Sequence, residues 1–235
     1  MNFLKIKNET DTAAEIEIYG DIVNDAWKGW NWTDSNVYPS DIKHMLDDVS
    51  GKDLTIRINS GGGDVFAGFA IANMIERFHG KTHAVIDGLC ASIATQIALA
   101  CDSVEIPKNA YFMMHKPFAG ASGTADDIRK TADLLDKLQD SIESKYVSRL
   151  RHPKDADKIH ELVNEETWLT GEEAADLFMI DCTDAKEAAA AVGSYAERLN
   201  GRPADLKIKD LAEERLQEEN KRAKAEIAVA LALID

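Results

Sequence analysis

The chain has 235 residues, of which 45% are hydrophobic, so it is long enough to bury a core of ordinary size. Its formal net charge of −15 makes direct contact with the phosphate backbone of a nucleic acid unfavourable. The longest apolar stretch carries Ser92, Thr95 and Gln96, and it is shorter than the roughly 20 residues that a membrane-spanning helix requires.

The N-terminal sequence MNFLKIKNETD contains no apolar signal-peptide region, so we expect a cytoplasmic protein. Three cysteines, Cys90, Cys101 and Cys182, do not have the spacing of a metal site. They indicate neither a disulfide framework nor zinc, and the first two are expected to be small core residues.

The N-terminal elements begin with the alternating segment AEIEIYGDIV, residues 14–23, which predicts a half-exposed strand. Residues 24–36 form a polar loop with three of the four tryptophans, which indicates either an interface or a lid over the core. Tyr38, Pro39 and Ser40 open a predicted helix that runs to Val49, with Ser40 as its N-cap.

Strands and helices alternate through the middle of the chain. Strands are predicted at 53–58, 82–87, 103–106 and 110–114, and helices at 65–78 and within DGLCASIATQIALAC, residues 87–101. Repeated strand, tight turn and helix units predict an α/β fold with a largely parallel sheet. Functional sites in such sheets lie at the carboxyl ends of strands, where the turns lead into helices.

The C-terminal third is predominantly helical by pattern. We predict a long helix over 124–150 with an apolar stripe, a shorter one over 156–163, and a third over 170–178 that begins with a capping box. After a linker, the charged segment to residue 235 is rich in helix-forming residues. The predicted domains are therefore 1–184, which holds the α/β elements, and 185–235, a helical, charged extension.

Three features carry potential chemistry. Ser92 lies among apolar residues, where its hydroxyl either bonds to its own helix or begins a helix at a reactive site. The segment SGGGD, residues 60–64, can converge backbone N–H groups on an anion or form a plain turn. His115 ends a predicted strand and His83 is its rival, whereas surface positions are expected for the other histidines, His44, His79, His152 and His160.

Four segments taken together resemble the proteolytic subunit of the Clp protease. They are INSGGGDVFAG, DGLCASIATQIALA, MMHKPFAGASGTADDI and EETWLTGEEAADLFMID, in this order along the chain. The resemblance runs from about Glu15 to Asp181, and it is stronger to the phage-encoded relatives known as prohead or head-maturation proteases. It implies the ClpP/crotonase-like fold and assembly into a homo-oligomeric ring.

The resemblance implies that Ser92 is the nucleophile, His115 the general base and Glu166 the acid, with Glu165 beside it as a competing choice. The oxyanion would be held by the backbone N–H groups of Gly63 and Ile93. These roles suit the chemistry, because an imidazole activates a serine hydroxyl, a carboxylate orients the imidazole, and two amides stabilise the tetrahedral oxyanion. The implied substrate-binding residues are Gly62, Phe118, Ala119, Gly120 and Ala121.

The chain departs from the family pattern at several positions. Glutamate occupies the acid position where aspartate is usual, Gly61 replaces a proline, and Ile93 and Ala94 replace methionine and glycine. A backbone donor survives a change of side chain, so Ile93 can still supply its N–H to the oxyanion. Residues 118–127 are expected either to align an extended substrate or to form a flexible loop.

The leading hypothesis is a serine endopeptidase that acts on polypeptides without a metal or cofactor. Its implied partners are capsid or scaffold proteins, by the phage resemblance, or an ATP-driven unfoldase, by the cellular one; no nucleic acid or membrane partner is expected. The alternatives are a crotonase-like acyl-CoA enzyme, a serine–lysine peptidase, and a non-catalytic assembly or scaffold module. Lys116 adjoins His115, but no lysine stands out from the sequence as the buried base that a serine–lysine peptidase needs.

Overall fold

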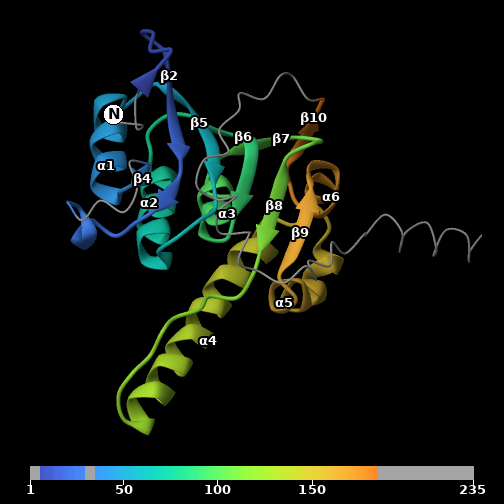
Figure 1. The fold of residues 1–235 in the computed structure, drawn as a ribbon. Helices are drawn as coiled ribbons and strands as arrows, with labels where there is room; N and C mark the ends of the chain where they lie inside the picture. Colours follow the sequence, from blue (N-terminus) through green and yellow to red (C-terminus); the bar gives the residue numbers. More distant parts are fainter. Residues whose placement is uncertain (1–5, 30–34, 185–235) are drawn as a thin grey trace, which may run out of the picture. The chain divides into compact units, whose positions relative to one another are not determined.

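The computed structural model describes residues 6–29 and 35–184 (Figure 1). Its strands are β1 (Ile6–Lys7), β2 (Ala13–Tyr19), β3 (Asp21–Ile22), β4 (Asn36–Val37), β5 (Asp53–Ser60), β6 (Thr82–Ala91), β7 (Ser103–Pro107), β8 (Tyr111–Met114), β9 (Thr167–Thr170) and β10 (Asp181–Thr183). Its helices are α1 (Pro39–Asp48), α2 (Val65–Glu76), α3 (Ile93–Ala98), α4 (Ala125–Ser148), α5 (Ala156–Asn164) and α6 (Gly171–Leu177), with short 3-10 turns at Asp25–Trp27 and Pro153–Asp155. The predicted extension 185–235 and two of the loop tryptophans, Trp30 and Trp32, lie outside the described residues.

The central sheet is mostly parallel, with the strand order β1-β2-β5-β6-β7-β10. Strand β1 is antiparallel to β2, whereas β2, β5, β6, β7 and β10 run in parallel along this path. Strand β6 is long enough to have two neighbours on one side, β7 along its first half and β8 along its second half. Strand β9 adds to β8 in the antiparallel sense. The predicted α/β fold with a largely parallel sheet is therefore confirmed.

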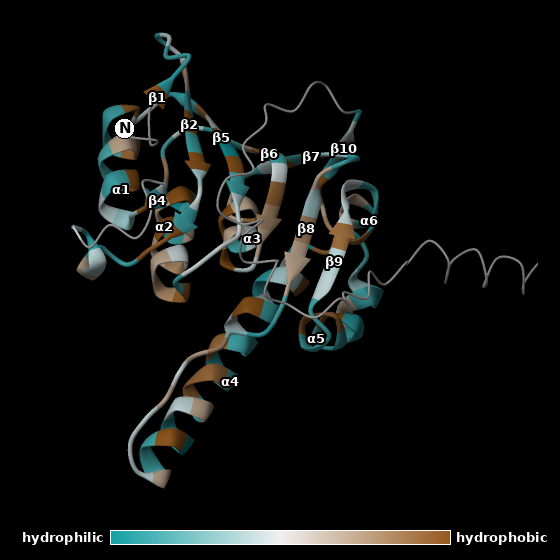
Figure 2. Ribbon diagram, in the orientation of Figure 1, coloured by the Kyte–Doolittle hydropathy of each residue, from teal (hydrophilic) through white to brown (hydrophobic). Residues whose placement is uncertain are grey.

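One face of the sheet forms the core against helices α1, α2 and α3 (Figure 1). Alternate residues of β5, Leu54, Ile56 and Ile58, are fully buried, as period-2 side-chain geometry requires. Burial of each such side chain contributes about 1.5–3 kcal/mol relative to exposure. Figure 2 shows that α2 and α3 are mostly hydrophobic in colour, which is consistent with their position in the interior.

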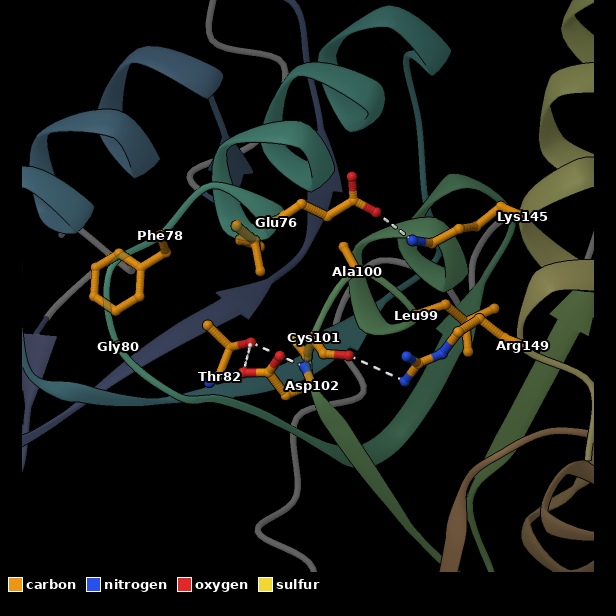
Figure 3. A pocket seen from close by; sticks show the side chains of 11 residues that line it. Glu76, Phe78, Gly80, Thr82, Leu99, Ala100, Cys101, Asp102, Lys145 and Arg149 are labelled. Atoms are coloured by element: carbon orange, nitrogen blue, oxygen red, sulfur yellow. Dashed lines mark hydrogen bonds and ion pairs between the residues drawn. The ribbon is translucent and has the colours of Figure 1, made fainter.

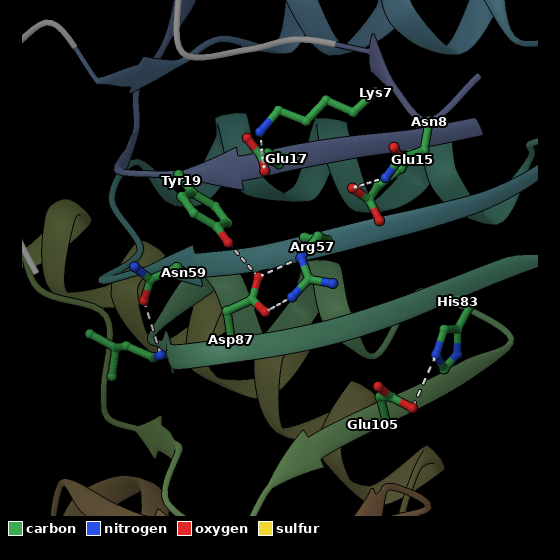
Figure 4. A network of polar contacts seen from close by, with 11 residues as sticks. Lys7, Asn8, Glu15, Glu17, Tyr19, Arg57, Asn59, His83, Asp87 and Glu105 are labelled. Atoms are coloured by element: carbon green, nitrogen blue, oxygen red, sulfur yellow. Dashed lines mark hydrogen bonds and ion pairs between the residues drawn. The ribbon is translucent and has the colours of Figure 1, made fainter. Parts of the chain in front are cut away.

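The opposite face of the same strands carries a polar network (Figure 4). Asp87 on β6 is 6% exposed and accepts hydrogen bonds from Arg57 Nε on β5 at 2.9 Å and from Tyr19 Oη on β2 at 2.5 Å. Burial, with the bond to Asp87, raises the pKa of Tyr19 above its usual range. A buried carboxylate needs such partners, and here they join three neighbouring strands.

Two predicted elements have different boundaries in the structure. The single strand predicted over 14–23 is divided into β2 and β3 by Gly20, which has φ +101° and packs so closely against Ser35 that only glycine fits. The helix predicted within 87–101 is shorter, because β6 continues to Ala91 and α3 covers only Ile93–Ala98. A short apolar run does not by itself distinguish a buried strand from a buried helix.

The predicted N-cap of α1 was wrong. Tyr38 is the N-cap without a side-chain bond, Pro39 is the first helical residue, and the Ser40 hydroxyl bonds to Asp25 at 2.5 Å instead. Proline lacks an N–H and its φ suits the first turn, so the helix begins there without a serine cap.

The capping boxes of α4 and α6 are both present. Thr124 pairs with Asp127 at the start of α4, and the predicted pair Thr170 and Glu173 begins α6. The apolar stripe predicted for the long helix is buried only in its C-terminal part. There Ile142 and Tyr146 are buried, whereas Ile128 and Leu134, nearer the N-terminus of α4, are exposed. The exposed residues belong to the N-terminal part of α4, which extends beyond the sheet in Figure 1.

Candidate active site

Three strand ends bring the predicted site residues together. Strand β5 leads into the glycine loop, defined as residues 60–64, β6 leads into Ser92, and β8 leads into His115. Because β6 is parallel to both β5 and β8, these three carboxyl ends lie at the same edge of the sheet. This is the position at which parallel α/β sheets form their sites.

Ser92 has a strained backbone between β6 and α3. Its φ and ψ are 55° and −130°, and a positive φ is uncommon for any residue other than glycine. The conformation is held by the Ser92 N–H, which donates to Met113 O at 2.9 Å. Ser92 is the N-cap residue of α3, so it begins the helix as one of the two sequence-based explanations expected, although its hydroxyl makes no cap hydrogen bond. It contacts His115 instead.

The distance between Ser92 Oγ and His115 Nε2 is 2.7 Å. This is hydrogen-bond distance, so the imidazole can accept the hydroxyl proton without a rearrangement. The two residues are separated by 23 positions in the chain and meet because β6 and β8 are neighbours. Strain at Ser92 is the local feature that aims the hydroxyl at the imidazole, as strained residues often do at reactive sites.

A second serine–histidine contact provides a comparison. His83 Nδ1 lies 2.8 Å from Ser103 Oγ, and its Nε2 lies 3.5 Å from Glu105 (Figure 4). These residues lie near the starts of β6 and β7, away from the strand ends that carry the glycine loop. His83 therefore lies near the first residue of β6, whereas Ser92 follows the last one. The remaining histidines, His44, His79, His152 and His160, are exposed as predicted.

The two candidate acids lie between α5 and β9, directly before the first residue of β9. The last pair in the antiparallel ladder is Met114 with Thr167, so an extension of the same register by one residue would set His115 opposite Glu166. Glu166 also has a positive φ of 53°, which is unusual for glutamate. Glu165 is the C-cap of α5 and donates its backbone N–H to Glu161 O at 2.9 Å. The ladder register favours Glu166 as the carboxylate that faces the imidazole.

The glycine loop packs directly against the serine. A Cβ on Gly62 would lie 2.7 Å from Ser92 Cβ and 3.1 Å from Ile93 N, so the loop approaches the start of α3 as only glycine allows. Among the described residues, the backbone N–H groups of Gly63 and Ile93 have no hydrogen-bond acceptor. An oxyanion requires two such amide donors close to the nucleophile.

The segment after His115 is open to solvent. The structure assigns no regular element to residues 115–122, and those from Phe118 to Ala121 are exposed. The Phe118 ring is 5.8 Å from the His115 ring and 78% exposed, so an aromatic side chain stands beside the imidazole. This segment has main-chain groups to offer to an extended peptide.

Two buried hydroxyls behind Ser92 were not predicted from the sequence. Thr95 Oγ1 donates to Ser92 O at 2.5 Å and lies 2.6 Å from the Tyr146 hydroxyl, which links the serine to α4. Burial raises the pKa of Tyr146 above its usual range. A threonine three residues after a serine in an apolar run was the only sequence signal for this chain of contacts.

A hollow of about 290 Å³ lies elsewhere, at the far end of α3 from Ser92 (Figure 3). Its lining includes Lys145, paired with Glu76, and Arg149, whose Nη2 donates to Cys101 O at 3.0 Å. None of the predicted site residues lines it.

Cys90 and Cys101 are buried as expected, and within 6–29 and 35–184 no group of His, Cys, Asp and Glu could hold a metal ion. Among the same residues, no helix has the length and apolar character needed to cross a membrane.

Residues 35–184 match the sequence profile of the family described as Clp protease. The chain belongs to the Clp protease family. Among its relatives, the ATP-dependent Clp protease proteolytic subunit of Bacteroides thetaiotaomicron is 34% identical over 142 residues, which are 58% of this chain and 62% of the relative. The corresponding subunit 3 of Rhodococcus jostii is 31% identical over 134 residues, or 55% of this chain and 64% of the relative.

The Clp protease fold is also found by comparison of structures. A ClpP1 mutant from Listeria monocytogenes superposes with a TM-score of 0.59 and 23% sequence identity, over 74% of this chain and 93% of that one. By contrast, the match spans slightly less than two thirds of the length of the Bacteroides and Rhodococcus relatives. Their names describe cellular proteolytic subunits and do not mention phage head maturation.

Proposed function

We propose that this chain is a serine endopeptidase of the Clp type, with Ser92 as nucleophile, His115 as general base and Glu166 as the orienting acid. The observation that carries the proposal is the 2.7 Å contact between Ser92 Oγ and His115 Nε2. It lies beside a glycine loop and at the carboxyl ends of parallel strands, where an acyl-transfer site needs its nucleophile and its amide donors.

The proposed reaction has two halves. His115 Nε2 takes the hydroxyl proton as Ser92 Oγ attacks the peptide carbonyl, and the carbonyl oxygen becomes an oxyanion that accepts hydrogen bonds from the Gly63 and Ile93 N–H groups. The protonated imidazole, stabilised by Glu166, then gives its proton to the leaving amine. Water, activated by the same imidazole, hydrolyses the acyl-serine and restores the free hydroxyl. No metal or cofactor takes part.

Polypeptides are the proposed substrates. An extended chain would add along Phe118, Ala119, Gly120 and Ala121 by main-chain hydrogen bonds, with Gly62 lining the site, which demands little sequence specificity. The exposed apolar residues Ile128 and Leu134 on α4 support assembly into a homo-oligomer, because such side chains gain from burial between copies. The relatives' description as subunits of an ATP-dependent protease supports an unfoldase partner, and the phage resemblance supports capsid or scaffold proteins as substrates.

The alternative functions have less support from the site. A crotonase-like acyl-CoA enzyme and a scaffold module would not need a serine and a histidine in contact. A serine–lysine peptidase needs a buried lysine as its base, because burial lowers the pKa of a lysine, and Lys116, which adjoins His115, is exposed.

The second serine–histidine contact supplies a matched control for the test. Hydrolysis of a fluorogenic peptide and of casein should fall by at least about 10³-fold in Ser92→Ala and His115→Ala. Ser103→Ala, which removes a hydroxyl that also lies 2.8 Å from a histidine, should keep wild-type kcat. Full hydrolysis by Ser92→Ala would overturn the proposal, and acyl-CoA turnover that survives this change would favour the crotonase alternative.

A further inference from the structure

Ser60, the last residue of β5, joins two backbone segments beside the site. Its hydroxyl donates to Gly20 O at 2.6 Å and accepts from the Gly62 N–H at 3.1 Å. The residue is only 2% exposed, so water cannot readily replace these bonds. The hydroxyl therefore ties the turn between β2 and β3 to the glycine loop.

Strand β3, which follows this turn, holds the peptide group that contains the Gly63 N–H. Ile22 on β3 donates its N–H to Gly62 O at 2.9 Å and accepts from the Asp64 N–H at 2.8 Å. In a planar trans peptide the N–H points away from the C=O of the same group. Because Gly62 O points toward Ile22, the Gly63 N–H points away from β3.

The position of Gly62 is coupled to that of the nucleophile. The site of a Gly62 Cβ is 2.7 Å from Ser92 Cβ and 2.8 Å from Ala91 O, so the loop and the serine are in contact. A shift of the loop therefore changes the place of the Gly63 N–H relative to Ser92 Oγ. Oxyanion donors are effective only at hydrogen-bond distance from the developing charge.

We propose that Ser60 is a positioning residue for the oxyanion site, acting through Gly62 on the Gly63 N–H. This inference rests on the proposed function and extends it to a residue outside the triad and the amide donors. Removal of the hydroxyl frees the Gly62 N–H and the Gly20 carbonyl at once. The loss should appear in the transition state, where the oxyanion forms, and much less in substrate binding.

The test compares Ser60→Ala with Thr82→Val. Thr82 is a matched control because it is 3% exposed and its hydroxyl also makes two bonds, both with Asp102, at 3.1 and 2.9 Å. It lies at the start of β6, away from the glycine loop. Both changes should lower the Tm to a similar extent, since each removes one buried hydroxyl with two partners.

Only Ser60→Ala should change catalysis. We expect its kcat for a fluorogenic peptide to fall about 10- to 100-fold, less than for the complete loss of an oxyanion donor, with KM within about twofold. The affinity for a peptide aldehyde, which forms a tetrahedral adduct, should fall in parallel, while that for an unreactive peptide amide of the same sequence stays constant. Ser60→Cys, a weaker donor, should give an intermediate kcat and serves where Ser60→Ala does not fold.

A folded Ser60 variant with the kcat and aldehyde affinity of Thr82→Val would overturn this role. So would a parallel rise in KM that accounts for the whole loss, because that pattern indicates a binding defect. These outcomes differ from failure of the proposed function, in which the wild-type protein itself shows no hydrolysis that depends on Ser92.

Discussion

Replacing Gly62 by alanine adds one methyl group at the point where the glycine loop meets the nucleophile. Gly62 has φ +90°, a conformation that costs a non-glycine residue about 1–2 kcal/mol. The new Cβ would also lie within 3.0 Å of Ser92 Cβ and Ala91 O, which are held by β6. Such overpacking typically costs a further 1–3 kcal/mol or so, and it is relieved only by moving the loop or the serine.

Gly51→Ala provides the matched control, because Gly51 has a similar φ of +84° and no atom within 4 Å of its Cβ position. Urea denaturation should show a loss of about 1–2 kcal/mol for Gly51→Ala and about 2–5 kcal/mol for Gly62→Ala. Peptide hydrolysis should fall by about 100-fold in Gly62→Ala, since a displacement near 1 Å costs that much, and remain unchanged in Gly51→Ala. Equal stability of the two variants, with normal kcat in both, would refute the packing argument.

Two further predictions concern the acid and a buried phenol. Glu166→Gln should lose far more kcat than Glu165→Gln, by about 100-fold or more, because the β8–β9 ladder, extended by one residue past Met114 and Thr167, would set Glu166 opposite His115. The reverse order in a peptide assay would move the assignment to Glu165. Burial raises the pKa of Tyr146, so the stability that comes from its neutral form is complete below the ordinary tyrosine pKa of about 10 and is lost as the pH rises above it. Denaturation between pH 10 and 11.5 should therefore show a free energy of unfolding that falls more steeply for wild type than for Tyr146→Phe, by about 1.4 kcal/mol per pH unit, whereas parallel curves would contradict the buried neutral phenol.

The fold was largely predictable because its signals are local. Alternation in β2, the capping box of α6, and glycines between strand and helix all lie within short windows of sequence. The segment 87–101 was the exception, since its continuous apolar run fits either a buried strand or a buried helix. Packing decides that choice: β6 extends to Ala91 because β8 pairs with its second half.

The candidate site was predicted through motifs and not through geometry. Ser92, His115 and Glu166 lie far apart in the sequence, and only the resemblance of ordered segments assigned them to one site. The supporting hydroxyls of Ser60 and Thr95 were missed, because a buried serine or threonine has no distinctive pattern until its partners are known. Likewise, the strained φ of Ser92 depends on its bond to Met113, a residue that the sequence alone does not place nearby.

Labelling with a fluorophosphonate probe tests the central claim, the pairing of Ser92 with His115, most directly. Peptide mapping by mass spectrometry should find one adduct per chain, on Ser92, and the rate of labelling should fall by at least about 10³-fold in His115→Ala while it is unchanged in His83→Ala. An adduct on another serine, or a labelling rate that does not depend on His115, would contradict the account.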